Sequence, residues 1–290
     1  MTDFISLPDS SSSKLATDKD GSERHWQKLK VSWGADGTFK DTTATDPLPV
    51  AWGQLNNSRG GAGASPIIVW GRHAAVGTGD TNLSPDGVFS AQSAAVAVQI
   101  KAGGSANDDA AGSHAREVTV YGLDGSGVAQ SSVIATAGAS ASAATTETYL
   151  RVISARVTGA GTYGNSNAAA IDIETTGAAA QAQIPIGAGR TQAGIYAVPT
   201  GKVGYVSGFS YSVKDTLIAT VKMWLREEID DASAPVKPIE LLDQFDDLSG
   251  SGSLDFSTHY VIPAKAEFYM TALSASGTPS VSARAHMTVL

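Results

Sequence analysis

The side chains best suited to acid–base chemistry or metal binding are thinly spread along this chain. No two of its five histidines stand two or four residues apart, so no strand or helix would place two of them on one face to hold a metal. The chain has no cysteine, which excludes disulfides and thiolate metal sites. It also lacks the Gly-x-Ser-x-Gly elbow of many serine hydrolases. We therefore expect no catalytic residues, no metal site and no enzymatic activity. The histidines are His25, His73, His114, His259 and His286.

One glycine pattern resembles a cofactor motif. Residues 159–164 read Gly-x-Gly-x-x-Gly after an expected strand at Tyr149–Thr158. A dinucleotide site needs this pattern to open a helix, whose N-terminus then faces the pyrophosphate. The residues that follow lead into a strand-like stretch at Ala169–Glu174. The pattern therefore predicts a hairpin loop between strands, and we expect no cofactor.

Acidic and aromatic clusters admit more than one interpretation. Asp80 with Asp86, and Asp108 with Asp109, do not follow the twelve-residue calcium-loop spacing, so solvated loops are expected there. The tryptophans would serve as docking anchors or as a platform for a saccharide, and core packing is at least an equal alternative for Trp70 and Trp224. Three of the five lie in or near the first fifty residues, which favours docking. The tryptophans are Trp26, Trp33, Trp52, Trp70 and Trp224.

Composition restricts the partners. The chain has 290 residues, 42% of them hydrophobic and only 17% charged, and its formal net charge is −8. An acidic chain without a basic cluster is poorly suited to nucleic acid or to an anionic membrane surface, so neither is expected as a partner. A surface with few long charged side chains loses little side-chain entropy on association. The composition therefore favours a protein that packs against neighbouring proteins.

The hydrophobic pattern predicts an all-β fold, an antiparallel β-sandwich of jelly-roll type with room for two β subdomains. Short apolar and β-branched runs alternate with turn residues, as in sandwiches and barrels. Helix-forming residues cluster only at 223–228, which reads better as a strand, and at 239–247. The expected strands are Ile67–Trp70, Ala94–Lys101, Glu117–Leu123, Ser132–Ala135, Tyr149–Thr158, Ala169–Glu174, Thr191–Ala197, Gly204–Val213, Ile218–Arg226, Thr258–Ile262, Ala266–Ser274 and Ser280–Val289.

The expected organisation has three parts: an extended arm over residues 1–50, a β-sandwich over 51–183, and a second β region over 184–290 that packs on the sandwich or completes it. The arm contains one strand-like stretch, at His25–Ser32, and prolines at alternate positions extend its end. We expect the arm to dock on a neighbour by adding a strand. Its candidate assembly contacts are Trp26, Trp33, Leu48 and Val50.

The order of several loop and strand motifs carries a family resemblance. Residues 122–124 read Gly-Leu-Asp, and 146–152 read Thr-x-Thr-Tyr-x-Arg-Val. Further matching segments lie at 157–162, 165–167, 183–184, 187–192 and 195–202, and the arm matches at 28–31, 33–37 and 46–50. Together they resemble a group of tailed-bacteriophage virion proteins. One departure is Asn167-Ala168, where the group has Asn-Ala-Gly.

The resemblance implies a β-sandwich module of a virion and leaves open whether it lies on the head, neck or tail. Our first hypothesis is a cement or head-fibre protein, assembled in the bacterial cytoplasm, that decorates or stabilises the capsid. We expect it to bind the major capsid protein or neighbouring virion proteins, and to form a homo-oligomer, a trimer by preference, by burying a face of low charge. Two alternatives remain: a neck, tail or baseplate component that adapts or recognises the host, and a carbohydrate-binding module. No catalytic residue transfers from the resemblance.

Overall fold

The computed structural model describes residues 64–102, 104–214 and 217–290, together with five short strands of the N-terminal part. The chain divides into two units, Met1–Ala62 and Gly63–Leu290. In the first unit, three strands form one antiparallel sheet and two form another. Leu48 and Val50 lie outside the described residues, as does most of the expected arm. The strands are β1 (Asp3–Ser6), β2 (Lys14–Lys19), β3 (His25–Gln27), β4 (Ser32–Trp33) and β5 (Lys40–Asp41).

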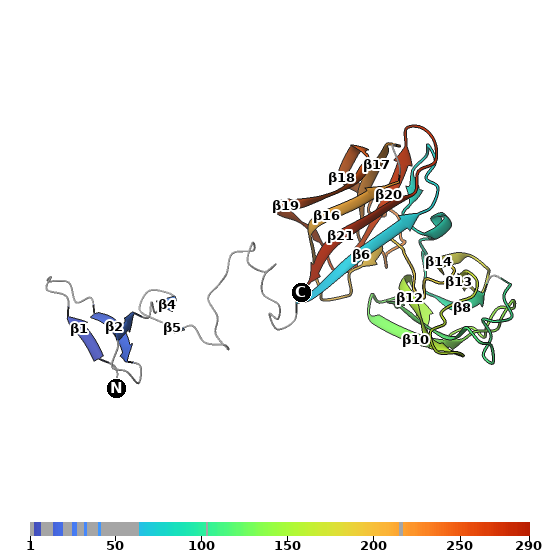
Figure 1. Cartoon of the computed structure of the whole chain (residues 1–290), viewed down its shortest axis with the longest axis horizontal. Helices are drawn as coiled ribbons and strands as arrows, with labels where there is room; N and C mark the ends of the chain where they lie inside the picture. Colours follow the sequence, from blue (N-terminus) through green and yellow to red (C-terminus); the bar gives the residue numbers. More distant parts are fainter. Residues whose placement is uncertain are drawn as a thin grey trace. The chain divides into compact units, whose positions relative to one another are not determined.

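The second unit contains two pairs of facing antiparallel sheets (Figure 1), and the all-β class is confirmed. The first pair, which we call the front sandwich, packs sheet β10-β9-β12 against sheet β11-β8-β13-β14, with one apolar cluster between them. Its strands are β8 (Val96–Ala102), β9 (Ala115–Leu123), β10 (Ala129–Ala135), β11 (Thr148–Tyr149), β12 (Arg151–Ala160), β13 (Ile171–Thr175) and β14 (Ala180–Ile184).

The second pair, the rear sandwich, packs sheet β15-β20-β17-β18 against sheet β19-β16-β21-β6 around a larger apolar cluster. A short strand, β7, also pairs with β20. The strands are β6 (Ser65–His73), β7 (Thr81–Asn82), β15 (Ile195–Ala197), β16 (Gly204–Val213), β17 (Ala219–Arg226), β18 (Ile239–Leu248), β19 (Gly250–Ile262), β20 (Glu267–Ser274) and β21 (Val281–Val289).

The rear sandwich is built from both ends of this unit, and the front sandwich is inserted between them. β6 pairs along its full length with β21, the last strand of the chain. The chain then forms β7 and the 3-10 turn η2 (Pro85–Gly87) before it enters the front sandwich. The expected division at 183–184 falls at the end of β14, whereas β6 and β7 belong to sheets of the rear sandwich. In the described part of the chain, no helix has the length and apolar character to cross a membrane.

Strict alternation of buried apolar residues with more exposed ones explains why the strands of the rear sandwich form. In β17, Ala219, Val221, Met223 and Leu225 are buried, and the residues between them are half-exposed. Successive side chains of a strand point to opposite faces, so every second residue enters the core. β21 repeats this pattern through Val289. These two strands lie where the sequence predicts them.

Several strands differ from the sequence-based expectation: β7 was not expected, β19 begins at Gly250, and the expected strand Tyr149–Thr158 is divided between β11 and β12. β18 and β14 differ as well. The cluster of helix-forming residues at 239–247 forms β18, which pairs with β17 instead of forming a helix. β14, at Ala180–Ile184, was expected only as an Ala/Gly/Thr-rich seam and pairs instead with β13. Pairing with a buried neighbour outweighs intrinsic propensity, since propensity differences amount to less than about 1 kcal/mol per residue.

The turn between β9 and β10 is a hairpin, as Asp124-Gly125 predicts, but the glycine that matters is a different one. Gly127 has φ +75°, whereas Gly125 keeps an ordinary φ. The Asp124 carboxylate accepts hydrogen bonds from the N–H groups of Ser126 (2.8 Å) and Val128 (2.9 Å). Asp124 therefore closes the turn through its side chain, and Gly127 supplies the left-handed conformation.

The consecutive strands β18 and β19 lie in the two different sheets of the rear sandwich, and a tyrosine of β19 links them. Tyr260 donates a hydrogen bond to Asp243 Oδ2 at 2.7 Å. Burial, with this hydrogen bond and the negative charge of Asp243, raises the pKa of Tyr260 to about 12.

The raised pKa of Tyr260 predicts a loss of stability at alkaline pH. The unfolded chain ionises near the ordinary value of 10, and the folded chain near 12. The contribution of Tyr260 is therefore complete below pH 10 and falls as pH rises from 10 to 12. Tyr260→Phe should show a smaller decrease in the free energy of unfolding between roughly pH 8 and roughly pH 11, measured by urea denaturation. Tyr163→Phe, at a fully exposed tyrosine, is the control, and its free energy of unfolding should fall with pH as that of the unchanged protein does. If the free energy of unfolding fell equally with pH in all three proteins, Tyr260 would not be the source of the alkaline loss of stability.

Candidate functional site

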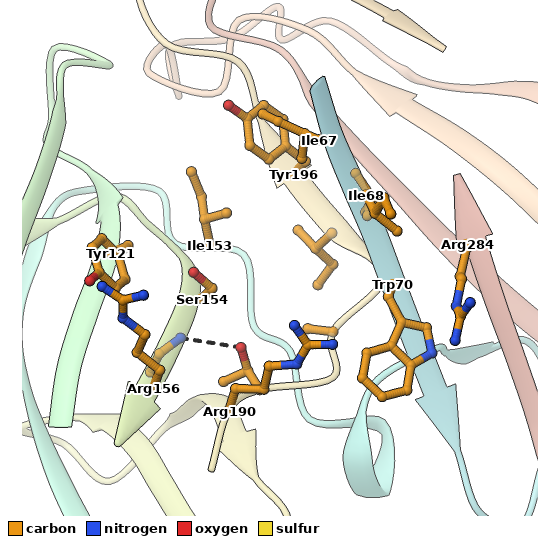
Figure 2. A pocket seen from close by; sticks show the side chains of 15 residues that line it. Ile67, Ile68, Trp70, Tyr121, Ile153, Ser154, Arg156, Arg190, Tyr196 and Arg284 are labelled. Carbon is orange, nitrogen blue, oxygen red and sulfur yellow. Dashed lines mark hydrogen bonds between the residues drawn. The ribbon is translucent and has the colours of Figure 1, made fainter. Parts of the chain in front are cut away.

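A groove of about 660 Å³ opens between the front and rear sandwiches (Figure 2). One wall is the edge strand β12, which contributes residues 153–156, and the other is the edge strand β6, which contributes residues 67–70. The segment that connects the two sandwiches contributes Arg190, Thr191 and Ala193, strand β15 contributes Ile195 and Tyr196, and Arg284 comes from β21. We call this the inter-sandwich groove.

Backbone hydrogen bonds on both sides hold the connecting segment in the groove. Thr191 N–H donates to Ala155 O (2.9 Å) on the β12 side, and Ala155 N–H donates to Thr191 Oγ1 (3.2 Å). On the β6 side, Arg72 N–H donates to Gln192 O (3.0 Å). Gly71 is required here, because a Cβ at this position would lie 2.2 Å from Leu83 O and 2.7 Å from Gly194 Cα. The base of the groove is therefore fixed to both sandwiches.

Three exposed arginines line the inter-sandwich groove, and aromatic rings support each of them. The Arg156 guanidinium lies 5.1 Å from the ring centre of Tyr121. Arg190 and Arg284 both contact Trp70, at 5.0 and 5.7 Å. Stacking on a ring holds a guanidinium in place and leaves its N–H groups at the ring edge available.

No carboxylate neutralises these arginines within the described residues. None of the ion pairs there includes them, and no aspartate or glutamate is among the groove's described lining residues. The chain as a whole has a net charge of −8, so this local excess of positive charge is unusual for it. Unpaired arginines around an open groove can bind carboxylate, phosphate or sulfate groups.

A buried ion pair joins the two sandwiches beside the groove. Arg151, at the start of β12, donates through Nε to Glu267 Oε2 in β20, and through Nη1 to Gln92 O and Leu150 O, both at 2.7 Å. Glu267 is fully buried, and Arg226 Nη1 lies 3.3 Å from its other oxygen. These contacts fix β12 against the rear sandwich and so set the width of the groove.

The residues that the sequence singles out belong to different elements of the structure. Trp26 belongs to β3 and Trp33 to β4, and their side chains lie outside the described residues. Asp80 accepts a hydrogen bond from Lys222 Nζ at 3.0 Å. In the described ranges, no group of three or more histidine, aspartate or glutamate side chains could hold a metal. Of the tryptophans named from the sequence, Trp70 lines the inter-sandwich groove, whereas Asp80 does not.

The expectation of a solvated loop is wrong for Asp108, which has a structural role in the interior. Its carboxylate is fully buried and accepts hydrogen bonds from the backbone N–H groups of Ala115 (3.1 Å), Ala168 (2.9 and 3.0 Å) and Ala169 (2.9 Å). Donors surround both oxygens, so the carboxylate holds two loops together rather than facing a cation.

The glycine pattern at 159–164 does join two strands, and β13 follows it rather than a helix. The prediction of a hairpin was wrong, because β13 pairs with β8 and β14 in the opposite sheet, not with β12. Gly161 is needed for close packing, since a Cβ there would lie 1.9 Å from Gly112 O.

Sequence reasoning missed the groove arginines. No role was assigned from the sequence to Arg156, Arg190 or Arg284. One signal was present: Arg284 sits in a strand whose alternate residues are apolar, which places its side chain on the outer face. Nothing in the sequence indicates that the outer face of β21 lies near β12.

Comparison with known protein families and with curated proteins finds no match to this chain.

Proposed function

We propose that the chain is a non-catalytic structural protein of a tailed-bacteriophage virion, which associates with the capsid through its N-terminal unit and presents the two sandwiches outward. One observation carries the proposal: residues 1–62 form a unit distinct from the body at 63–290. A separate N-terminal unit on an all-β body suits a protein that docks by one end. The order of motifs that resembles virion proteins supports the same function.

Exposed apolar residues support self-association, with a trimer as the favoured state. Ile239 (47% exposed) and Leu241 (44%) lie on β18, and Leu254 (44%) and Val261 (54%) on β19. Each strand is the edge of its sheet. Exposed apolar side chains on unpaired edges are typical of surfaces that another chain covers.

The inter-sandwich groove favours a second candidate function within the virion, that of a neck, tail or baseplate component that recognises the host. An open groove with preformed arginines is suited to binding a ligand, which a purely mechanical shell protein does not need.

Sedimentation with particles tests the first function. Particles of the encoding phage, assembled without this gene product, are mixed with the full chain or with residues 63–290, and bound protein is measured after pelleting. We expect the full chain to pellet at high copy number and the shortened chain to remain in solution. Light scattering should give the mass of a trimer, and thermal unfolding should show that residues 63–290 are folded. A folded, full-length chain that stays in solution with intact particles would contradict capsid decoration and leave the host-recognition function.

A further inference from the structure

We propose that the inter-sandwich groove binds an extended acidic peptide segment of another protein, which adds a strand beside β6. The identification of that protein as a virion neighbour rests on the proposed function, whereas the chemistry of the groove does not.

The positive charges of the groove indicate that its ligand is negatively charged. Arg156, Arg190 and Arg284 come from β12, the connecting segment and β21, and they line one groove without an acidic partner in the described residues. Like charges brought together repel unless an anion lies between them. In a chain of net charge −8, long-range attraction of nucleic acid is disfavoured. A ligand with a few local carboxylates suits the groove better.

The backbone of β6 indicates an extended ligand. In an antiparallel ladder, the N–H and C=O of one residue point to the same side, and alternate residues point to opposite sides. Arg72 N–H donates to Gln192 O, away from β21. The register with β21 has no irregularity, so Ile68 and Trp70 also direct their backbone groups away from β21, to the open edge. No described residue pairs with these groups, which makes this part of β6 available for strand addition.

The opposite wall offers an apolar counterpart. Ile153 stands at an irregularity of β12, where the register with β9 skips one residue between Val152 and Ser154. Its side chain and that of Ile68, which is 65% exposed, both line the groove. In Figure 2, Ile67 and Ile153 lie above the groove centre, and Arg156 and Arg190 lie below it.

The presence of both basic and apolar side chains in the lining of the groove favours a peptide over other anions as the ligand. A single phosphate or sulfate ion would leave most of the 660 Å³ and all the isoleucines unused. An added strand alternates its side chains between two faces. Acidic residues on its outer face would meet Arg284, which shares that face with Trp70, and apolar residues on its other face would lie on the side of Ile67. A polyuronate would satisfy the arginines but not the isoleucines.

Calorimetric titration of the full chain tests the proposal with a capped peptide of alternating glutamate and valine. We expect saturable binding of one peptide per chain. The matched peptide of alternating glutamine and valine should bind at least about tenfold more weakly, and so should the acidic peptide to Arg190→Gln.

Two variants at one position test strand addition. Ile68→Pro removes the outward N–H without breaking the ladder to β21, where an edge strand tolerates proline. Ile68→Ala removes more of the side chain than Ile68→Pro does, but it keeps the N–H. Binding should fall much further in Ile68→Pro than in Ile68→Ala, with equal thermal unfolding temperatures. Equal loss in the two variants would overturn strand addition.

Titration with an oligogalacturonate, as a second probe, distinguishes an acidic saccharide ligand from the proposed peptide ligand. Binding of the oligogalacturonate with no binding of the acidic peptide would overturn the proposal and favour a glycan receptor. Absence of peptide binding in a chain that still pellets with particles would overturn this groove assignment alone, and the proposed virion function would stand.

Discussion

Replacing Arg151 with methionine is expected to lower the free energy of unfolding by about 3–5 kcal/mol, because the change leaves a buried carboxylate without its main partner. Glu267 is fully buried, and Arg151 is 3% exposed. Arg226 remains 3.3 Å from Glu267 but is partly open to solvent, so it compensates only in part. Urea denaturation followed by tryptophan fluorescence measures the loss.

The same strand provides the control for Arg151. Arg156→Met removes an exposed arginine of β12 that has no carboxylate partner in the described residues, and should change the stability by less than about 0.5 kcal/mol. The double variant Arg151→Met, Glu267→Leu removes both charges and should be more stable than Arg151→Met alone. Equal losses at Arg151 and Arg156 would show that the buried pair does not hold the sandwiches together.

Replacing Asp108 with alanine is expected to lower the free energy of unfolding by about 3 kcal/mol, since it leaves one buried and two partly buried N–H groups without this acceptor. These groups belong to Ala115, Ala168 and Ala169. The loss should be nearly independent of calcium or a chelator, because donors and not cations surround the carboxylate. Thermal unfolding with and without the chelator measures both effects.

The neighbouring aspartate provides the control for Asp108. Asp109 Oδ1 accepts a hydrogen bond from Ala111 N–H at 3.0 Å in an exposed loop, so Asp109→Ala should cost about 1 kcal/mol or less. Asp108→Asn keeps one acceptor oxygen and should fall between the two alanine variants. A stability for Asp108→Ala equal to that of Asp109→Ala would contradict the role given to the buried carboxylate.

The all-β class could be predicted from local pattern because a strand leaves its period in the sequence. Gly204–Val213 was expected with the bounds that the structure gives, and the buried residues of β21 alternate through the whole strand. β18 could not be found in this way, since its residues favour a helix in isolation. Only its pairing with β17, a buried neighbour, makes the extended conformation the more stable one.

The candidate site depends on contacts that local pattern does not contain. Arg156, Arg190 and Arg284 are separated by long stretches of chain, and the insertion of the front sandwich between β7 and β15 brings them together. Arg151 illustrates the same limit, because its partner Glu267 is 116 residues away. No periodicity reports a contact across that separation.

The sequence by itself therefore determined the strand-rich class, the expectation of a non-catalytic protein and most strand positions, because backbone pleating and turn chemistry act over a few neighbouring residues. The tertiary structure decided which strands share a sheet, that β6 closes the rear sandwich, and that three arginines meet at one groove. The physical reason is that sheet pairing and burial are set by the free energy of the whole fold, where distant segments compete for the same partners.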